Sequence, residues 1–138
     1  MDFGLSEDQL LLEKTLRSFL AEEVSISRVR DLRDADCPND VGIWRSLAEL
    51  GVTGMLIPET QGGSDLSLLD AALVAQSLGH AVTPTPFVGS AVMAPIAFRA
   101  LAGNETAGWL QGIAAGEIRF GVAAQIPVDQ TEVAGDRA

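Results

Sequence analysis

The stretch SLLDAALVAQSLG, residues 67–79, decides the fold class of this chain. Ser67 is a favourable N-cap for a helix, Asp70 would lie in its first turn, and Gly79 marks its predicted end. Alanine, leucine and valine fill most positions between them, so this helix has little polar surface. A helix that is apolar almost all round lies inside a bundle of helices. We therefore predict an all-α helical bundle in which this helix is covered on several sides.

Another helix is predicted upstream, over about residues 7–24. Ser6 and Gln9 have the spacing of a capping box, and Leu5 and Leu10 are placed as a hydrophobic staple would require. Apolar residues at helical spacing then predict one buried face: Leu12, Leu16, Phe19 and Leu20. This helix is therefore expected to pack against the apolar one.

Two further segments separate these helices. Residues 25–39 alternate arginine with aspartate, which predicts a solvated segment, at most with a frayed helical end. A short helix is predicted over residues 41–50, capped by Asn39 or Asp40 and ended by Gly51. Its buried stripe would consist of Trp44, Leu47 and Ala48. Glycine and proline exclude a regular helix after Gly51, and Met55–Ile57 is expected to be a short extended piece.

The remaining helices are predicted over about residues 87–102 and 105–115. Pro95 removes a backbone hydrogen bond inside the first of them, so a kink is expected there. In the second, Trp109, Leu110 and Ile113 are expected to face inward. Residues 118–126 are typical of a strand, and a polar tail follows. We therefore predict about five helices in a domain of residues 1–117, with one C-terminal strand and the tail in residues 118–138.

Composition excludes several functions. The 138 residues carry a net charge of −10 and one lysine, Lys14, which disfavours nucleic acid, anionic membranes and the phosphates of coenzyme A. The chain shows no signal peptide, no apolar stretch long enough to span a membrane, and only one cysteine, so a cytoplasmic protein is expected. His80 is the only histidine, and no residues have metal-ligand spacing, so no metal site is predicted.

Three segments carry a resemblance to a known family. They are FGLSEDQLLLEKTLRSFLAEE (3–23), WRSLAELGVTGMLIPETQGGSDLSLLDAALVAQSLG (44–79) and WLQGIAAGEIRFGVA (109–123). In this order and at this spacing they resemble the N-terminal helical domain of acyl-CoA dehydrogenases. The resemblance covers roughly residues 2–125 and ends at the first strand of that family's middle β domain.

The resemblance implies an activity that this chain is not expected to perform alone. Family members oxidise the Cα–Cβ bond of acyl-CoA thioesters with FAD, and an electron-transfer flavoprotein usually reoxidises the flavin. They form dimers or tetramers. The catalytic glutamate belongs to the C-terminal bundle, and most flavin contacts come from the middle and C-terminal domains. We therefore expect no catalytic residue here, and no FAD held without the other domains or a partner subunit.

The expected contribution of this domain is a wall of the acyl pocket. The matching segment is PFVGSAVMAPIAFRAL, residues 86–101, and its small or adaptable side chains leave room for a bulky acyl group. The predicted pocket residues are Phe87, Ser90, Ala91, Met93, Ala94 and Ala97. The segment TPTPF, residues 83–87, resembles members that act on sterol side chains or other bulky acyl groups. Close helix–helix packing is the alternative explanation for the small residues.

Other functions remain open at this point. The chain could be a subunit of a split dehydrogenase, a non-catalytic helical module that binds a protein partner, or a small carrier for apolar ligands. A homo-oligomer or hetero-oligomer is expected if the chain is part of a dehydrogenase or binds a protein partner.

Overall fold

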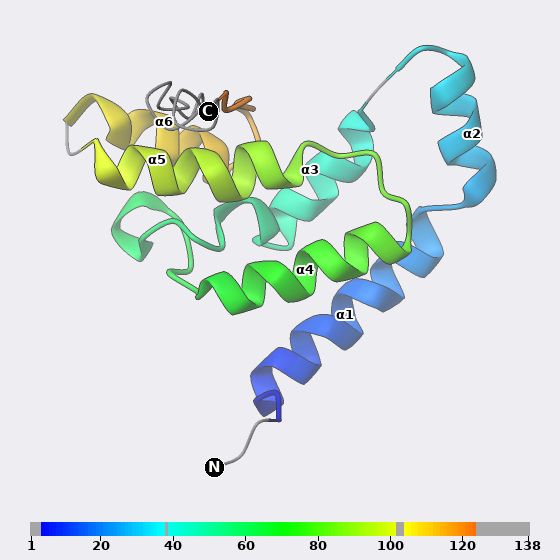
Figure 1. Ribbon diagram of the computed structural model, residues 1–138, viewed down its shortest axis with the longest axis horizontal. Helices are drawn as coiled ribbons and strands as arrows, with labels where there is room; N and C mark the ends of the chain where they lie inside the picture. Colours follow the sequence, from blue (N-terminus) through cyan, green and yellow to red (C-terminus); the bar gives the residue numbers. More distant parts are fainter. Residues whose placement is uncertain (1–3, 38, 102–103, 124–138) are drawn as a thin grey trace, which may run out of the picture.

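The computed structural model describes residues 4–37, 39–101 and 104–123. Its α-helices are α1 (Glu7–Glu23), α2 (Ile26–Asp34), α3 (Val41–Glu49), α4 (Leu68–His80), α5 (Ala94–Ala100) and α6 (Asn104–Ala114). Shorter helical turns are η1 (Val52–Gly54), η2 (Glu59–Gln61) and η3 (Val88–Met93). Figure 1 shows α4 between α1 on one side and the layer of α3 and α5 on the other. The predicted all-α bundle is confirmed for the described residues, where no helix is long and apolar enough to cross a membrane.

The starts of α1 and α4 are capped and joined to each other. The Ser6 hydroxyl accepts from the Gln9 backbone N–H at 3.1 Å, and the Gln9 side-chain Oε1 accepts from the Ser6 N–H at 3.0 Å. This confirms the predicted capping box of α1. Ser67 and Asp70 form a second capping box on α4. The Gln9 side-chain amide donates to Asp70 Oδ1 at 3.0 Å, so one hydrogen bond ties the two helix starts together.

The segment predicted to be solvated forms the regular helix α2, so that prediction was wrong in part. The Ser25 hydroxyl caps α2 by accepting from the Arg28 N–H at 3.2 Å. None of its residues is buried, as the alternating charges suggested. Its Arg28 pairs with Asp40 at the start of α3, a partner twelve residues away that local sequence patterns do not reveal.

Residues 52–66 cross the bundle as tight turns. Met55–Ile57 was predicted to be extended but forms a buried turn, because Gly63 allows the chain to fold back upon it. A Cβ atom at Gly63 would stand 2.0 Å from the Ile57 carbonyl oxygen. The Gly63 and Asp65 N–H groups donate to the carbonyls of Pro58 and Ile57. The turn is therefore held by backbone hydrogen bonds that a side chain at Gly63 would prevent.

α4 is covered by α1 on one side and by residues of α3 and η3 on the other. Its buried residues include Ala71, Leu73, Val74 and Leu78, which pack in part against α1. Leu68 and Leu69, by contrast, are 60% and 54% exposed. The predicted cover on several sides therefore holds for the middle of α4, whereas its first turn leaves two leucines exposed.

The helix predicted over residues 87–102 forms as η3 followed by α5, and its distortion is a π-turn. The Ala94 N–H donates to the Gly89 carbonyl, five residues back instead of four. Pro95 has no N–H, and its ring crowds the carbonyl four residues earlier, so a regular α-helix cannot continue through it. The wider turn before Pro95 lets the helix pass the proline without ending.

α6 contributes to a small second core. Leu110 and Ile113 pack against Ile57 and Ala94, as their predicted inward orientation requires. Trp109 was predicted to face inward but is 43% exposed. Its ring contacts that of Phe98 at a centroid distance of 5.3 Å, with the two planes tilted by 47°, and Phe98 in turn packs against that core.

The C-terminal segment has no regular secondary structure in its described part, residues 117–123. The strand predicted over residues 118–126 is therefore absent from 118–123, where no described strand lies beside it to pair with. Instead, the Phe120 N–H donates to the Ser90 hydroxyl at 3.0 Å. Residues 124–126 and the predicted polar tail lie outside the described residues.

Candidate functional site

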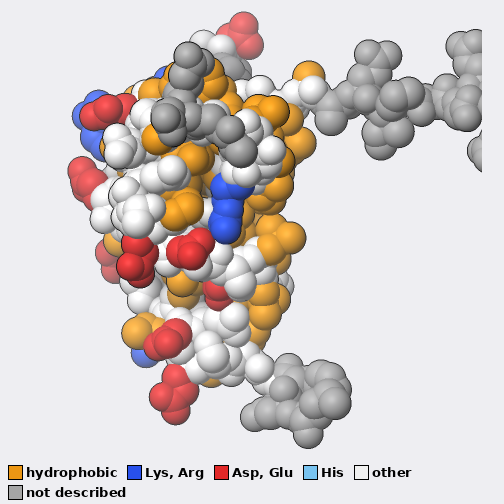
Figure 2. Space-filling model, turned by 90° about the vertical axis from the view of Figure 1, so that its left-hand side faces the viewer, with side chains coloured by type: hydrophobic (Ala, Val, Ile, Leu, Met, Phe, Trp, Pro, Cys, Tyr) orange, Lys and Arg blue, Asp and Glu red, His pale blue; other side chains and the backbone are white. Residues whose placement is uncertain are grey.

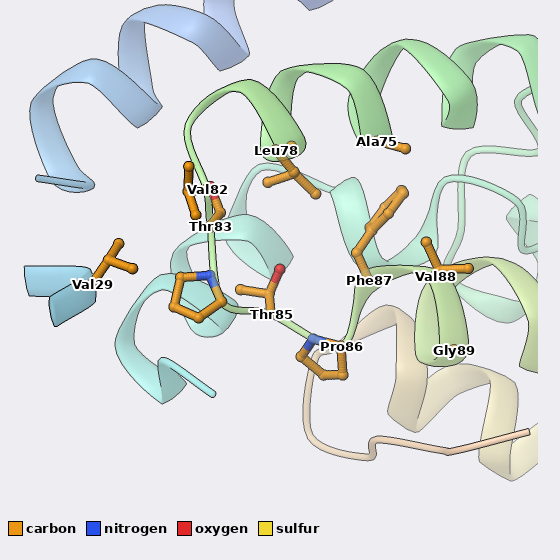
Figure 3. A pocket seen from close by; sticks show the side chains of 12 residues that line it. Val29, Ala75, Leu78, Val82, Thr83, Thr85, Pro86, Phe87, Val88 and Gly89 are labelled. Carbon is orange, nitrogen blue, oxygen red and sulfur yellow. The ribbon is translucent and has the colours of Figure 1, made fainter. Parts of the chain in front are cut away.

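An apolar groove of about 550 Å3 lies where the loop after α4 leads into η3 (Figure 3). We call it the α4–η3 groove. Its lining consists of Val29 of α2, of Ala75, Leu78 and Gly79 of α4, and of residues 82–89. The volume is typical of small-molecule sites. None of the lining side chains is ionisable, so the groove is suited to hold an apolar group but offers no acid or base.

The loop that forms one wall of the groove starts with a strained residue. Val82 has a φ of 51°, a left-handed conformation that a β-branched residue rarely adopts. The Thr83 N–H donates to the Leu78 carbonyl at 2.9 Å, and the Val82 N–H donates to the Gly79 carbonyl at 3.1 Å. This is the Schellman ending of a helix, with valine at the position that glycine usually takes. The helix ends at His80, one residue beyond the predicted Gly79, and the left-handed Val82 turns the chain into the loop.

The same loop is held from the other side by Asp40. The Asp40 N–H donates to the Pro84 carbonyl at 2.8 Å. The buried Asp40 carboxylate caps α3 by accepting from the Ile43 N–H at 3.1 Å. It also accepts two hydrogen bonds from the guanidinium of Arg28, with Nη2 at 3.0 Å from Oδ1. Arg28 is the neighbour of Val29 in α2, so this ion pair also fixes the α2 wall of the groove.

The ion pair shifts both titrating groups in the expected directions. The hydrogen bonds from Arg28 hold the pKa of the Asp40 carboxyl below its usual value, and burial opposes that shift only in part. The hydrogen bond to Asp40 likewise raises the pKa of Arg28. The pair thus stays charged at neutral pH, beside the groove but not in its lining.

Two hydroxyl groups in the groove wall lack partners. The Oγ1 atoms of Thr83 and Thr85 are both buried and accept or donate no hydrogen bond to any described residue. Figure 3 shows the Thr85 oxygen pointing towards the space between Thr83, Leu78 and Phe87. Buried hydroxyls are normally hydrogen-bonded, so this pair is unusual.

The structure does not gather the predicted pocket residues around one cavity. Phe87 is buried and lines the α4–η3 groove. Ser90 is buried and binds the Phe120 N–H. Ala91 and Ala94 are fully buried in the two hydrophobic cores. For these small residues, the geometry matches the alternative of close helix packing.

The other two predicted residues lie away from the interior. Met93 is 38% exposed, and Ala97 is half-buried. Neither lines the α4–η3 groove. Sequence reasoning missed the lining residues Val29, Ala75 and Leu78, which have the same pattern as ordinary core residues. The available signal was the TPTP segment, residues 83–86, in which threonine and proline alternate in an otherwise apolar region.

No group of three potential ligands suitable for a metal ion occurs within the described part of the chain. Cys37 is exposed. The α4–η3 groove, with its apolar lining, is a candidate ligand site of the described structure.

Comparison with known proteins identifies the family. Residues 6–117 match the model of the acyl-CoA dehydrogenase N-terminal domain. The acyl-CoA dehydrogenase IpdE2 of Mycolicibacterium smegmatis is 36% identical over 87 residues, which cover 62% of this chain and 28% of the relative. The chain thus matches little more than a quarter of that relative's length.

Solved structures have the same arrangement of helices. The ChsE4–ChsE5 complex from Mycobacterium tuberculosis superposes with a TM-score of 0.78 at 25% identity, over 86% of this chain and 33% of that one. A variant of the Tcur3481–Tcur3483 steroid ACAD superposes with a TM-score of 0.71 at 26% identity, over 82% and 31%. With the family model matching most of its length, this chain belongs to the acyl-CoA dehydrogenase family, as an N-terminal helical domain.

Proposed function

We propose that this domain forms part of the acyl site of a flavin-dependent acyl-CoA dehydrogenase, which oxidises the Cα–Cβ bond of an acyl-CoA thioester. The observation that carries the proposal is the family match over residues 6–117, together with an apolar groove between α4 and η3. In this proposal the acyl group lies against Phe87 and the loop before it. The rest of the segment 86–101 supports that wall through the packing of Ala91 and Ala94.

The chemistry of the groove supports binding and argues against catalysis by this domain. Abstraction of an α proton needs a base, and the groove lining contains no carboxylate, histidine or lysine. Asp40 lies nearby but is engaged by Arg28 and caps α3. We therefore assign the proton-abstracting base to another domain or to a partner subunit of the complete enzyme.

The same lining does not fit FAD. It offers no cation to pair with the diphosphate of FAD, which proteins commonly bind through arginine, lysine or helix N-termini. The net charge of −10 likewise disfavours the phosphates of coenzyme A on this domain. We propose that other parts of the enzyme hold the flavin and the phosphates, and that an electron-transfer flavoprotein accepts the electrons in the cytoplasm.

The outer surface supports assembly with further protein. Figure 2 shows hydrophobic side chains along the right-hand edge of the view, from the level of α5 down to that of α4. Val88 is 55% exposed and Ile96 is 48% exposed, and Leu68 and Leu69 add to the exposed apolar surface. Exposed apolar patches of this kind often mark interfaces. Because the structural relatives include a complex of two different chains, we propose a partner subunit or adjoining domains against this surface.

An engineered block of the groove tests the proposed acyl site. Ala75 lines the groove, whereas Ala72, one turn earlier on α4, is exposed and does not line it. In the complete enzyme, Ala75→Phe should lower kcat/KM for bulky acyl-CoA substrates by up to roughly 10- to 200-fold, while short acyl groups are affected less. The matched control Ala72→Phe should leave this preference unchanged.

Two results would contradict the proposal. One is an unchanged acyl preference in Ala75→Phe, with stability lowered by overpacking alone. The other is turnover by the 138-residue chain on its own that a single substitution in it abolishes. Tight association with a partner that has no dehydrogenase activity would instead favour a helical interaction module.

A further inference from the structure

Another cavity, of about 420 Å3, lies where the C-terminal halves of α1 and α4 meet the start of α2. We call it the α1–α4 cavity. Figure 1 shows the end of α4 beside the link from α1 to α2. The apolar part of its lining consists of Leu20, Ala21, Val24, Ile26 and Ala81. The volume is within the range of small-molecule sites, and none of these residues lines the α4–η3 groove.

The ionisable residues of this cavity are basic. Arg17 lines it from α1 and His80 from the end of α4, and no carboxylate among the described residues lines it. The chain as a whole has 19 acidic residues against nine lysines and arginines. A cavity lined by basic residues alone therefore runs against the charge of the molecule. Such a cavity attracts a ligand of the opposite sign, here one with a negative charge.

Both basic side chains keep hydrogen-bond donors for a ligand. Arg17 Nη2 lies 2.7 Å from Oε1 of Glu13, one turn earlier on α1, and the Arg17 side chain is still 49% exposed. A guanidinium has several N–H donors, so this pair leaves others available. His80 is exposed, and its ring carries an N–H donor even when neutral. A carboxylate can therefore bind both residues without displacing Glu13.

The apolar part of the cavity suits a hydrocarbon body. Ile26, the first residue of α2, is 51% exposed. Leu20 is buried and forms the floor beneath it, whereas Val24 is half-buried. An apolar ligand in the cavity would cover part of the Ile26 side chain, and removal of this surface from water favours binding.

We propose that the α1–α4 cavity binds a free carboxylic acid with a short apolar body, whose carboxylate is held by Arg17 and His80. An acyl-CoA fits less well, because its phosphates bring several more negative charges than these two residues can balance. The site goes beyond the proposed function, in which the acyl group lies in the α4–η3 groove. His80 lies on a different face of α4 from Leu78 and Gly79, which line that groove, so the two sites are separate.

Calorimetric titration of the 138-residue chain with octanoate tests the proposal, with octanamide as an uncharged ligand of the same shape. Octanoate should bind roughly three- to tenfold more tightly, as expected for a charged contact that is partly exposed. Arg17→Gln and His80→Gln together should remove this preference. Lys14→Gln also removes a positive charge from α1, but outside the cavity, and should retain the preference.

Two further measurements locate the ligand. In methyl NMR spectra, octanoate should shift the signals of Ile26 and leave those of Val88, which lines the α4–η3 groove, unchanged. Ala21→Phe, at an exposed position of the cavity, should fill its apolar part and weaken octanoate and octanamide alike. Ala72→Phe, at an exposed position that lines neither site, should weaken neither ligand.

Several outcomes would overturn the inference. Equal affinity for octanoate and octanamide would do so, as would a preference that survives the double change of Arg17 and His80. Absence of binding would also reject it. Shifts at Val88 instead of Ile26 would place the ligand in the α4–η3 groove, against this site. The proposed dehydrogenase function is judged separately, by the Ala75→Phe acyl profile of the complete enzyme.

Discussion

At the scale of single residues, the left-handed backbone conformation follows α2, α3, α4 and α6. Asp36, Gly51, Val82 and Gly116 have φ angles of 51°, 77°, 51° and 73°, and each follows the last turn of a helix. Glycine takes this conformation freely, whereas other residues are strained in it. Asp36 and Val82, the two non-glycine residues among these four, are therefore strained. The strain is greater at Val82, because its side chain is β-branched.

Val82→Gly should relieve that strain. We expect the free energy of unfolding to rise by about 0.5–1 kcal/mol. This is the energy cost of the left-handed conformation for valine, minus the entropy cost of ordering glycine, which is more flexible in the unfolded chain. Urea denaturation measures the change. Gly116→Ala is the opposite control, because its Cβ would stand 2.5 Å from that of Ala48 and it should destabilise the domain. A loss of stability in Val82→Gly would show that the valine side chain contributes more through contacts than it costs in strain.

Asp40 should make the domain sensitive to acid. Its pKa in the folded state is lowered from 3.8 by the hydrogen bonds from Arg28, so the folded protein binds fewer protons here than the unfolded chain. The stabilisation is therefore fully present above about pH 4 and is lost as the pH falls through the lower folded pKa. Asp70, lowered by its hydrogen bond from Ser67, adds to the same trend.

The measurement is the free energy of unfolding between pH 2 and pH 6. Asp40→Asn should flatten the acid part of the curve and loosen the cap of α3, whereas Asp31→Asn, at an exposed position of α2, should leave the curve nearly unchanged. An identical acid dependence in Asp40→Asn would show that the Arg28 pair does not contribute to the native state in solution.

At the scale of elements, the small side chains of η3 and α5 set how closely these helices approach the rest of the domain. Ala94 is 1% exposed and packs against Ile57, Leu110 and Ile113. Ala94→Phe should therefore overpack this core and lower the free energy of unfolding by about 1–3 kcal/mol, with little change in acyl preference. Ala100→Phe, at an exposed position of α5, is the control. A changed acyl profile at wild-type stability would place an acyl pocket at Ala94 after all.

The sequence predicted the elements whose signals are local. Ser6, Gln9 and Ser67 marked the starts of α1 and α4 correctly, because a capping residue and its partner lie within one turn. α2 was missed because its main tie, from Arg28 to Asp40, is not local. The end of α4 was placed too early at Gly79, since the backbone bonds of a Schellman ending can impose a left-handed conformation on a valine as well.

The candidate site was predicted less well than the fold. The stripe from Phe87 to Ala97 was recognisable by its small residues, but small residues serve close packing and ligand cavities equally. Which of the two applies depends on the partner surface, and for Ala91 and Ala94 that partner is the core of the domain itself. The groove instead brings Val29 of α2 against α4 and the loop that follows it, and these parts of the chain are distant in sequence.

At the scale of the whole molecule, the domain leaves apolar side chains uncovered along η3 and α5. On its own, the chain should be helical and self-associate through this surface. Ile96→Glu places a charge on the exposed strip without disturbing the core and should shift sedimentation towards monomer with unchanged helical content. Glu49→Gln, at an exposed site on α3, is a neutral control. A strict monomer at high concentration, without binding of apolar dyes, would argue against an interface here.

The hydrogen bond from Gln9 to Asp70 has a consequence for the motions of the domain. Each capping box would otherwise let its helix start fray independently, as first turns commonly do. Here Gln9, which completes the capping box of α1, also binds the Asp70 carboxylate, which completes the capping box of α4. If the first turn of either helix opens, this shared hydrogen bond is therefore lost to both. In amide hydrogen exchange, the first turns of α1 and α4 should therefore open as one cooperative unit, although Gln9 and Asp70 are 61 positions apart in the sequence.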